Sequence, residues 1–443
     1  IVTRAPGAHL AYPDIAAVEA EIEAATVSWA DSLAEALAAS GDAALAQVGG
    51  RYADAFPAAY RDQIGPADAL ADIARLEALK TAGLADGAAS FHAYREAGDG
   101  PSTLHLKLLR AGGPAELSSV LPILENMGLT VVEEQNFKVS PRDFARPVTI
   151  HAFSMRLKRP QPIALGDIQA AFEDAVAAAW NGVSENDGFN ALTLASGLDR
   201  KAVTILRAIA KFLRQAGIQF SQPYMEEALV RNADIAALIY DLFAARFQPG
   251  RPGDGAGDVH QRIEDALGDV KSLDEDRILR RFRNVVDAML RTNAWQRDES
   301  GAERPALAFK LDSTKLDELP APRPWVEIFV YSPRVEGVHL RFGRVARGGI
   351  RWSERREDFR TEILGLVKAQ QVKNAVIVPV GSKGGFYPKA LPKEASREAA
   401  NAEGVAAYTI FIGALLDITD NIAADGTIVP PKDVVRIDGD DPY

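Results

Sequence analysis

The sequence predicts a multidomain protein of mixed α/β and α+β class, in which two helical regions alternate with a small strand-and-helix module and a larger α/β domain. Three observations predict this. The 443 residues are too many for one hydrophobic core. Apolar residues recur with helical spacing in some stretches and alternate, as in strands, in others. Turns rich in Gly and Pro separate these stretches.

Composition excludes several classes of function. The chain has no cysteine, which excludes disulfides, thiolate nucleophiles and cysteine metal ligands. The six histidines show neither HxxxH nor HExxH spacing, so we expect no metal site. No run of 18 or more uncharged apolar residues indicates a membrane span, and the N-terminus shows no basic segment followed by an apolar one. We expect a cytoplasmic protein that binds neither membrane nor nucleic acid.

The first two regions differ in the period of their apolar residues. Residues 1–95 are predicted to be helical, with Asp14 capping one helix and Pro66 to Ala82 forming another. Residues 96–182 are predicted to form a β-α-β-β-α module from Leu104 to Leu108, Ala115 to Met127, Leu129 to Val139, Thr149 to Lys158, and Ile168 to Trp180. This order resembles the ferredoxin-like regulatory module called the ACT domain. Gly112, Gly113 and Gly128 either contact an effector there or only close loops.

Residues 183–300 are predicted to be helical again, with helices from Lys201 to Ala216 and from Met225 to Arg246. A Gly/Pro-rich linker covers residues 249–257. Its Gly253-x-Gly255-x-Gly257 spacing superficially matches a dinucleotide-binding motif. We reject that interpretation, because the motif follows a helix instead of a strand and lies among prolines.

Residues 301–443 are predicted to be an α/β domain that is incomplete at its C-terminus. Its strands are Trp325 to Tyr331, Val338 to Phe342 (after a turn near Glu336 and Gly337) and Ala375 to Val380. One helical face carries Phe359, Ile363, Leu366, Gln370 and Lys373. Residues 354–360 are predicted to be a solvated helix face. A later helix runs from Val405 to Ile422, and Ile428 and Val429 return toward the sheet.

A basic stretch lies in this last region of an otherwise acidic chain. Residues 341–389 carry seven Arg and four Lys against four acidic residues, a net charge of +7, whereas the whole chain carries −11. Such an island suits a small anion better than a long polyanion, which the acidic surroundings would repel. Lys383 is predicted to lie on a Gly-rich turn, where glycines without Cβ atoms let a ligand approach its amine.

The stretch ARGGIRWSERREDFRTEILGLVKAQQVKNAVIVPVGSKGGF resembles the large bacterial NAD-dependent glutamate dehydrogenases. The flanking FKLDS, LPAPRPWVEIFVYSPRVEGVHLRFG and LLDITDNI extend the resemblance more weakly. It implies an α/β substrate domain of glutamate dehydrogenase type and oxidative deamination of L-glutamate to 2-oxoglutarate and ammonia. It also implies NAD as hydride acceptor, a homo-oligomer, and an amino-acid effector at the ACT-like module.

The resemblance also implies the roles of individual residues. Lys383 matches the catalytic lysine, Lys373 the group that holds the α-carboxylate, and Arg347 the group that holds the side-chain carboxylate, with Gly348, Gly349 and Arg351 completing the substrate site. Neighbouring cations or desolvation can keep a lysine amine neutral, so that it activates water. Two departures concern Arg347, which stands where smaller relatives have lysine, and the shorter segment between the two lysines.

Three further expectations concern what the chain does alone. With no nucleotide-binding motif, NAD is expected to bind mainly to a domain outside this chain, so the 443 residues alone are not expected to turn over glutamate. Asp417, Asp420, Asp433 and Asp438 match no known motif, and the aspartate that shuttles protons is expected beyond Tyr443. Two alternatives remain: a non-catalytic amino-acid-sensing regulatory or assembly protein, and a phosphate-binding enzyme using Gly381 to Gly385, which lacks the GxxxxGK[ST] spacing.

Overall fold

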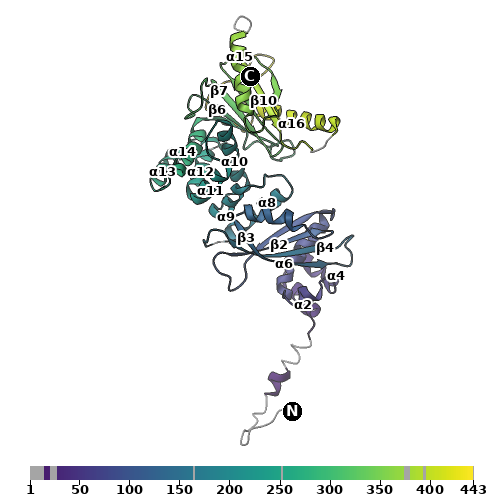
Figure 1. The fold of residues 1–443 in the computed structure, drawn as a ribbon. Coiled ribbons are helices and arrows are strands. Elements are labelled where there is room, and N and C mark those ends of the chain that lie inside the picture. Colours follow the sequence, from purple (N-terminus) through teal and green to yellow (C-terminus); the bar gives the residue numbers. More distant parts are fainter. Residues whose placement is uncertain are drawn as a thin grey trace. The chain divides into compact units, whose positions relative to one another are not determined.

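The structure of the chain, a computed structural model, describes residues 14–19, 27–162, 165–250, 253–373, 380–392 and 396–442. It divides into two compact units (Figure 1). The first unit contains Ile1–Leu121 and Thr130–Pro160, and the second contains Pro122–Leu129 and Gln161–Tyr443.

A four-stranded sheet of order β1-β2-β4-β3 forms the centre of the first unit. Its strands and the two helices that follow them in sequence are β1 (Ala89–Tyr94), β2 (Thr103–Ala111), α7 (Leu117–Asn126), β3 (Leu129–Val139), β4 (Val148–Leu157) and α8 (Leu165–Trp180). The predicted β-α-β-β-α order is confirmed. The prediction that residues 1–95 are helical is wrong at its end, because β1 pairs there as an edge strand with β2 and buries Phe91 and Ala93.

Short helices cover one face of this sheet (Figure 1). They are α2 (Trp29–Ala39), α3 (Ala43–Ala46), α4 (Gly49–Tyr52), α5 (Ala58–Arg61) and α6 (Pro66–Thr81). The predicted helix from Pro66 is confirmed, and Asp14 caps its segment as predicted, since its side chain accepts a hydrogen bond from the Ala16 amide at 3.1 Å. Leu37 and Ile73 pack with Leu109 and Ile150 of the strands, so the helices and the sheet share one core.

The second unit contains α8 and then a series of further helices: η1 (Gly188–Ala191), α9 (Leu192–Ser196), α10 (Arg200–Gln215), α11 (Gln222–Arg231), α12 (Ala233–Phe247), α13 (Ala256–Leu267) and α14 (Leu273–Ala288). The single helix predicted from Met225 to Arg246 is wrong. Asn232 interrupts it with φ −113° and ψ 50°, and its side-chain amide donates to Glu275 at 2.9 Å. Gly253 and Gly255, with φ of +82° and +72°, form the turn before α13.

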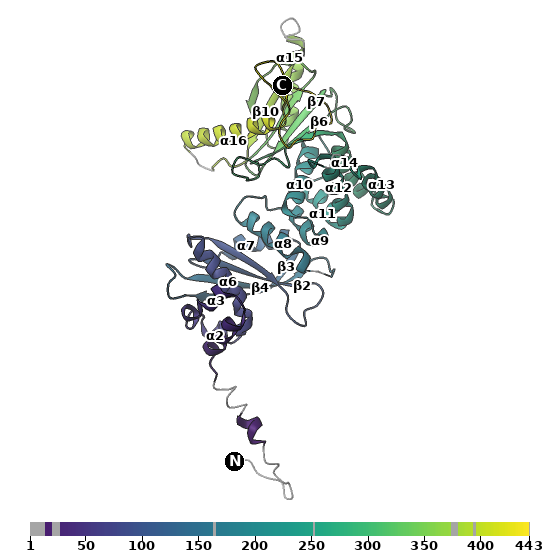
Figure 2. The same ribbon diagram turned by 180° about the vertical axis from the view of Figure 1, so that it is seen from behind.

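The second unit continues with a six-stranded sheet of order β5-β6-β7-β8-β10-β9. Its strands are β5 (Met289–Thr292), β6 (Leu307–Asp312), β7 (Val326–Tyr331), β8 (Val335–Arg341), β9 (Ile350–Trp352) and β10 (Ser382–Pro388). Neighbours pair antiparallel except β9 and β10, which are parallel. Helices α15 (Phe359–Lys373) and α16 (Arg397–Asp417) each pack against this sheet, and Figure 2 shows α16 apart from the helices α10 to α14.

Three predictions for this domain are wrong. Glu336 and Gly337 lie inside β8 and not in a turn. Glycine is needed at position 337 for packing, because a Cβ there would come 2.5 Å from the ring of Phe411. The helix predicted to reach Ile422 ends at Asp417. Beyond it, β11 (Asn421–Ile422) and β12 (Ile428–Val429) form a separate two-stranded sheet, so Ile428 does not return to the larger one. Most of the strand predicted from Ala375 to Val380 lies outside the described residues.

Helix α16 is long and apolar enough to cross a membrane by length and composition, with a mean hydropathy of 1.4 over its most apolar window. Among the described helices it alone passes this test. One such helix is weak evidence of a membrane span. Ala407, Phe411 and Ala414 are buried in a core shared with the strands, as in the core helix of a globular domain.

Candidate functional site

The predicted site residues of the basic stretch meet where the chain runs beside β10. Arg347 bridges to Gly381, the Ser382 amide donates to the Arg347 carbonyl at 3.1 Å, and the Gly384 amide donates to the Gly349 carbonyl at 3.1 Å. The parallel ladder then continues into β9. Residues 347–352 and 381–386 therefore form one continuous two-stranded edge of the sheet.

Strand alternation assigns these residues to the two faces of the sheet. Gly385 faces α15, since a Cβ there would lie 2.3 Å from Ile363, and Lys383 shares that face two residues earlier. By the same alternation Arg347, Gly349 and Arg351 lie on the α15 face as well. The opposite face carries Gly337 and Phe386, which pack with α16.

Two glycines allow this close approach. A Cβ at Gly348 would lie 1.6 Å from the Ser382 carbonyl oxygen, so only glycine permits the two segments to pair. A Cβ at Gly349 would lie 3.5 Å from the Lys383 amine, which is ordinary van der Waals contact. The Lys383 amine therefore lies over the backbone of Gly349.

The prediction that Lys383 lies on a Gly-rich turn is wrong, because it is the second residue of strand β10. Glycines follow it because Ile350, His339 and Ile363 pack directly against the strand. Within the part of the chain that the structure describes, neither Lys383 nor Arg347 forms an ion pair.

The other two predicted cations are placed differently. Arg351 donates to Glu362 of α15 at 2.6 Å, so this guanidinium already has a carboxylate partner. Lys373 ends α15, the helix that covers the face carrying Lys383, as the spacing predicted. The side chain of Lys373 lies outside the described part of the structure.

A buried ion pair anchors the start of α15. Arg360 donates to Glu327 of β7 at 2.6 and 3.0 Å, and these side chains are 1% and 0% exposed. Gln215 of α10 also accepts from the Arg360 amide at 3.2 Å. The prediction of a solvated helix face over residues 354–360 is therefore wrong, because residues 354–358 precede α15 and Arg360 faces the sheet.

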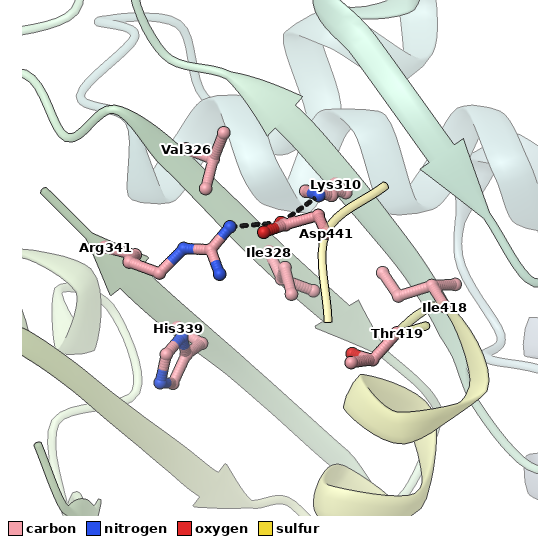
Figure 3. A pocket seen from close by; sticks show the side chains of 8 residues that line it. All are labelled: Lys310, Val326, Ile328, His339, Arg341, Ile418, Thr419 and Asp441. Carbon is pink, nitrogen blue, oxygen red and sulfur yellow. Dashed lines mark hydrogen bonds and ion pairs between the residues drawn. The ribbon is translucent and has the colours of Figure 1, made fainter. Parts of the chain in front are cut away.

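A second group of cations lies on the other face of the sheet and was missed in the sequence (Figure 3). Arg291, Lys310 and Arg341 are each at most 3% exposed. Asp441 lies between Lys310 and Arg341 and pairs with both. Arg291 donates to Asp420 at 3.0 Å and to Asp438 at 2.7 Å. These contacts fix the segment from Asp438 to Asp441 onto strands β5, β6 and β8.

The cavity lined by Lys310 and Arg341 leaves almost no space for a ligand. It measures about 10 Å³ and is also lined by His339, Thr419 and Asp441 among others, which is about the volume one water needs. Burial, and then the neighbouring Arg341, lower the pKa of His339 to about 4. Hydrogen bonds from Arg341 and Lys310 hold the pKa of Asp441 below its usual value, although burial opposes this.

Three of the four aspartates considered for proton transfer form ion pairs with arginines. Asp420 and Asp438 pair with Arg291, and Asp417 pairs with Arg304 at 3.1 Å. Asp433 has a φ of +55°.

A signal for the missed charged residues was present in the sequence. Lys310 and Glu327 each interrupt an otherwise apolar strand, and a charge in that position needs a partner.

The fold is a mixed helical and α/β arrangement whose α15 face carries Arg347 and Lys383, neither of them in an ion pair within the described residues. Comparison with known proteins identifies the family. The family model described as "Bacterial NAD-glutamate dehydrogenase, catalytic domain" matches residues 262–443. Models of the glutamate dehydrogenase helical motif 2, ACT3 domain and helical motif 3 match residues 33–79, 88–168 and 184–249. The chain belongs to the bacterial NAD-glutamate dehydrogenases.

Three relatives, each named NAD-specific glutamate dehydrogenase, support this assignment. The protein of Halomonas elongata is 44% identical over 434 residues, which cover 97% of this chain and 26% of the relative. That of Pseudomonas aeruginosa is 44% identical over 437 residues, 97% of this chain and 27% of the relative. That of Mycobacterium tuberculosis is 46% identical over 432 residues, 94% and 26%. The chain thus spans about a quarter of the length of the curated relatives that it matches.

Proposed function

We propose that this chain supplies the substrate-binding domain and a regulatory region of an NAD-dependent glutamate dehydrogenase, which converts L-glutamate to 2-oxoglutarate and ammonia. The observation that carries the proposal is the pairing of residues 347–349 with Ser382 and Lys383, which brings an exposed guanidinium and an amine to one face of the sheet. Glutamate and 2-oxoglutarate both carry two carboxylates, and fixed cations bind carboxylates.

Each residue has a proposed role. Arg347 binds the side-chain carboxylate, because its guanidinium fork can bind two oxygens at once. Lys373 binds the α-carboxylate from the end of α15. Lys383 is the catalytic lysine, whose amine activates the water that releases ammonia. Gly348 lets the Arg347 segment pair closely with β10, Gly349 leaves the Lys383 amine open to substrate, and Arg351 holds Glu362 beside the site.

NAD, when bound, accepts the hydride that leaves the α-carbon of glutamate. The described residues of this chain do not fit a dinucleotide, since the two larger sheets lack a strand–Gly-rich turn–helix unit between parallel strands in the part that the structure describes. We therefore assign NAD binding mainly to a domain outside this chain. The chain alone is proposed to be inactive.

The proposed organisation follows the four regions of the sequence. Residues 1–95 and 183–300 are helical regions apart from strands β1 and β5, residues 96–182 form most of the ACT-like module, which binds an amino-acid effector, and residues 301–443 form the substrate domain. We further propose a cytoplasmic homo-oligomer. The rival function, an amino-acid-sensing regulatory or assembly protein, requires the site at Lys383 to be inert.

Replacement of Lys383 in the full-length polypeptide tests the proposal. Lys383→Ala is expected to lower kcat by a factor on the order of 10²–10⁴, the usual contribution of a group that transfers protons. Binding of 2-oxoglutarate, measured by calorimetry, should change much less. Lys368→Ala is the matched control, because Lys368 is an exposed lysine of α15, and its turnover should equal that of the wild type. Turnover of Lys383→Ala within about tenfold of the wild type would reject the assignment.

A further inference from the structure

A cavity in the second unit lies apart from the residues assigned above. It has a volume of about 220 Å³ and is bounded by the first turn of α10, the turn after β7 at Ser332 and Pro333, and the segment from Glu303 to Leu307 that leads into β6. One ordered water needs only about 10–15 Å³ of such volume. Pockets for drug-sized ligands are typically about 300–1,000 Å³. The cavity therefore suits a metabolite of a few heavy atoms.

Lys201 differs from the other basic residues of α10, all of which form ion pairs. Arg200 pairs with Asp174 and Glu303, Arg207 with Asp187, Lys211 with Glu185, and Arg214 with Glu357. Lys201 lines the cavity and has no hydrogen bond or ion pair to any residue that the structure describes. Its amine instead lies 4.6 Å from the centre of the Trp295 ring.

The position of Lys201 makes an anion favourable there. The side chain is partly buried, and this burial lowers the pKa of its amine, with Glu303 opposing the shift. A cation held partly out of water beside an aromatic face gains only a modest stabilisation from the ring. A carboxylate would satisfy its hydrogen-bond donors as well.

The rest of the lining distinguishes among anions. Glu303 lies on the rim, where its carboxylate accepts from Arg200 at 3.0 Å and retains capacity for another donor. The lining also includes apolar residues, with Ala306 buried and Pro305, Leu307 and Pro333 beside it, together with polar groups such as Thr204 and Asn293. An amine, a carboxylate and apolar side chains in the lining of one cavity match the three groups of an α-amino acid.

We propose that this cavity binds a small α-amino acid, with its carboxylate on Lys201, its ammonium on Glu303 and its side chain against the apolar residues of the lining. The site is separate from the one at Lys383 and does not require it. A connection exists, because Lys389, directly after β10, donates to the Ser332 carbonyl at 2.8 Å and to Glu336 at 2.7 Å. A ligand in contact with Ser332 is thus linked, through Lys389, to the strand that carries Lys383.

Calorimetry on the full-length polypeptide tests the site, using each of the common L-α-amino acids in turn and propanoate as a carboxylate without an ammonium group. At least one amino acid should bind with a Kd of about 1 mM or tighter. Lys201→Ala should weaken that binding about ten- to hundred-fold, and Lys201→Arg should restore most of it. Propanoate should bind more weakly than the amino acid, because it leaves Glu303 unused.

Two controls separate this site from the proposed active site. Lys271→Ala, which removes an exposed lysine in the connection between α13 and α14, should leave binding unchanged. Lys383→Ala should lower turnover by the factor given above but retain the amino-acid binding. If no amino acid binds, or if Lys201→Ala binds as well as the wild type, the proposal is overturned. Binding that disappears in Lys383→Ala but persists in Lys201→Ala would assign the ligand to the active site instead.

Discussion

Two groups of cations on opposite faces of the six-stranded sheet differ in whether the chain supplies their partners. On the α16 face, Arg291, Lys310 and Arg341 are buried, and each pairs with an aspartate of the chain itself. On the α15 face, Arg347 and Lys383 have no acidic partner among the residues that the structure describes. Both groups lie on neighbouring strands, since Arg341 is the register partner of Ser382, the residue before Lys383.

This difference separates structural cations from those available to a ligand. A buried cation without a partner is costly, so the chain supplies Asp420, Asp438 and Asp441 for the first group. Cations at a binding site must lack internal partners, because an external carboxylate would otherwise compete with an aspartate that is already in place. Basic residues alone do not mark a site, and the pairing of each one decides its role.

The largest expected effect comes from breaking the paired group. Arg291→Ala leaves Asp420 and Asp438 without their main partner, and removal of one member of a buried pair typically costs about 3–5 kcal/mol. The urea midpoint of the second unit, followed by tryptophan fluorescence, should fall accordingly. Arg436→Ala is the control, because Arg436 also contacts Asp420 but is 26% exposed, and its loss should cost about 1 kcal/mol or less. Equal effects of the two variants would contradict the comparison.

The second prediction concerns pH on the paired face. The pKa of His339 is about 4 in the folded chain, because burial and Arg341 disfavour its charged form, against about 6.5 when unfolded. Between these values the unfolded chain binds a proton that the folded chain does not, so the free energy of unfolding falls as the pH falls. The loss should approach about 3 kcal/mol near pH 4 and vanish above about pH 6.5.

Comparison of wild type with His339→Gln isolates this contribution from the carboxylates that titrate in the same range. The free energy of unfolding should fall more steeply for the wild type than for the variant between about pH 6.5 and pH 4. Parallel curves would show that His339 is not kept neutral by its surroundings.

The contrast also explains which parts of the structure the sequence could predict. Helix α15 and the strands of the ACT-like module were predicted because each depends on its own apolar period, such as Phe359 and Ile363 on one helical face. The association of Lys383 with the Arg347 segment came from a resemblance. The roles of Lys383 and Arg347 in catalysis and binding stay a prediction.

What the sequence could not predict depends on partners distant in the chain. Asp441 pairs with Arg341 and Lys310 across about a hundred residues or more, and no local pattern links them. Gly337 and Gly384 resemble turn residues in the sequence. In the structure they lie in strands, and they are glycines because Phe411 and Ile350 occupy the space that a side chain would need. For the same reason the sequence predicted Lys383 on a turn, since glycines follow it.

The third prediction sharpens the comparison at the unpaired group. Gly348→Ala puts a Cβ where the Ser382 carbonyl oxygen now lies 1.6 Å away, so the edge strand must separate. Overpacking of this kind costs about 1–3 kcal/mol. Turnover of the full-length polypeptide should fall strongly as well, because Arg347 and Lys383 lose their common frame. Thermal unfolding and initial rates measure the two effects.

Gly349→Ala is the matched variant one residue further on and should have the smallest effect on stability. Its Cβ would meet only the Lys383 amine, at 3.5 Å, without touching backbone. The melting temperature should therefore stay close to that of the wild type, while the rate should drop because a methyl group covers the amine from the side of Arg347. If Gly349→Ala keeps full activity, substrate does not approach Lys383 across this glycine, and the unpaired cations on the α15 face do not act together.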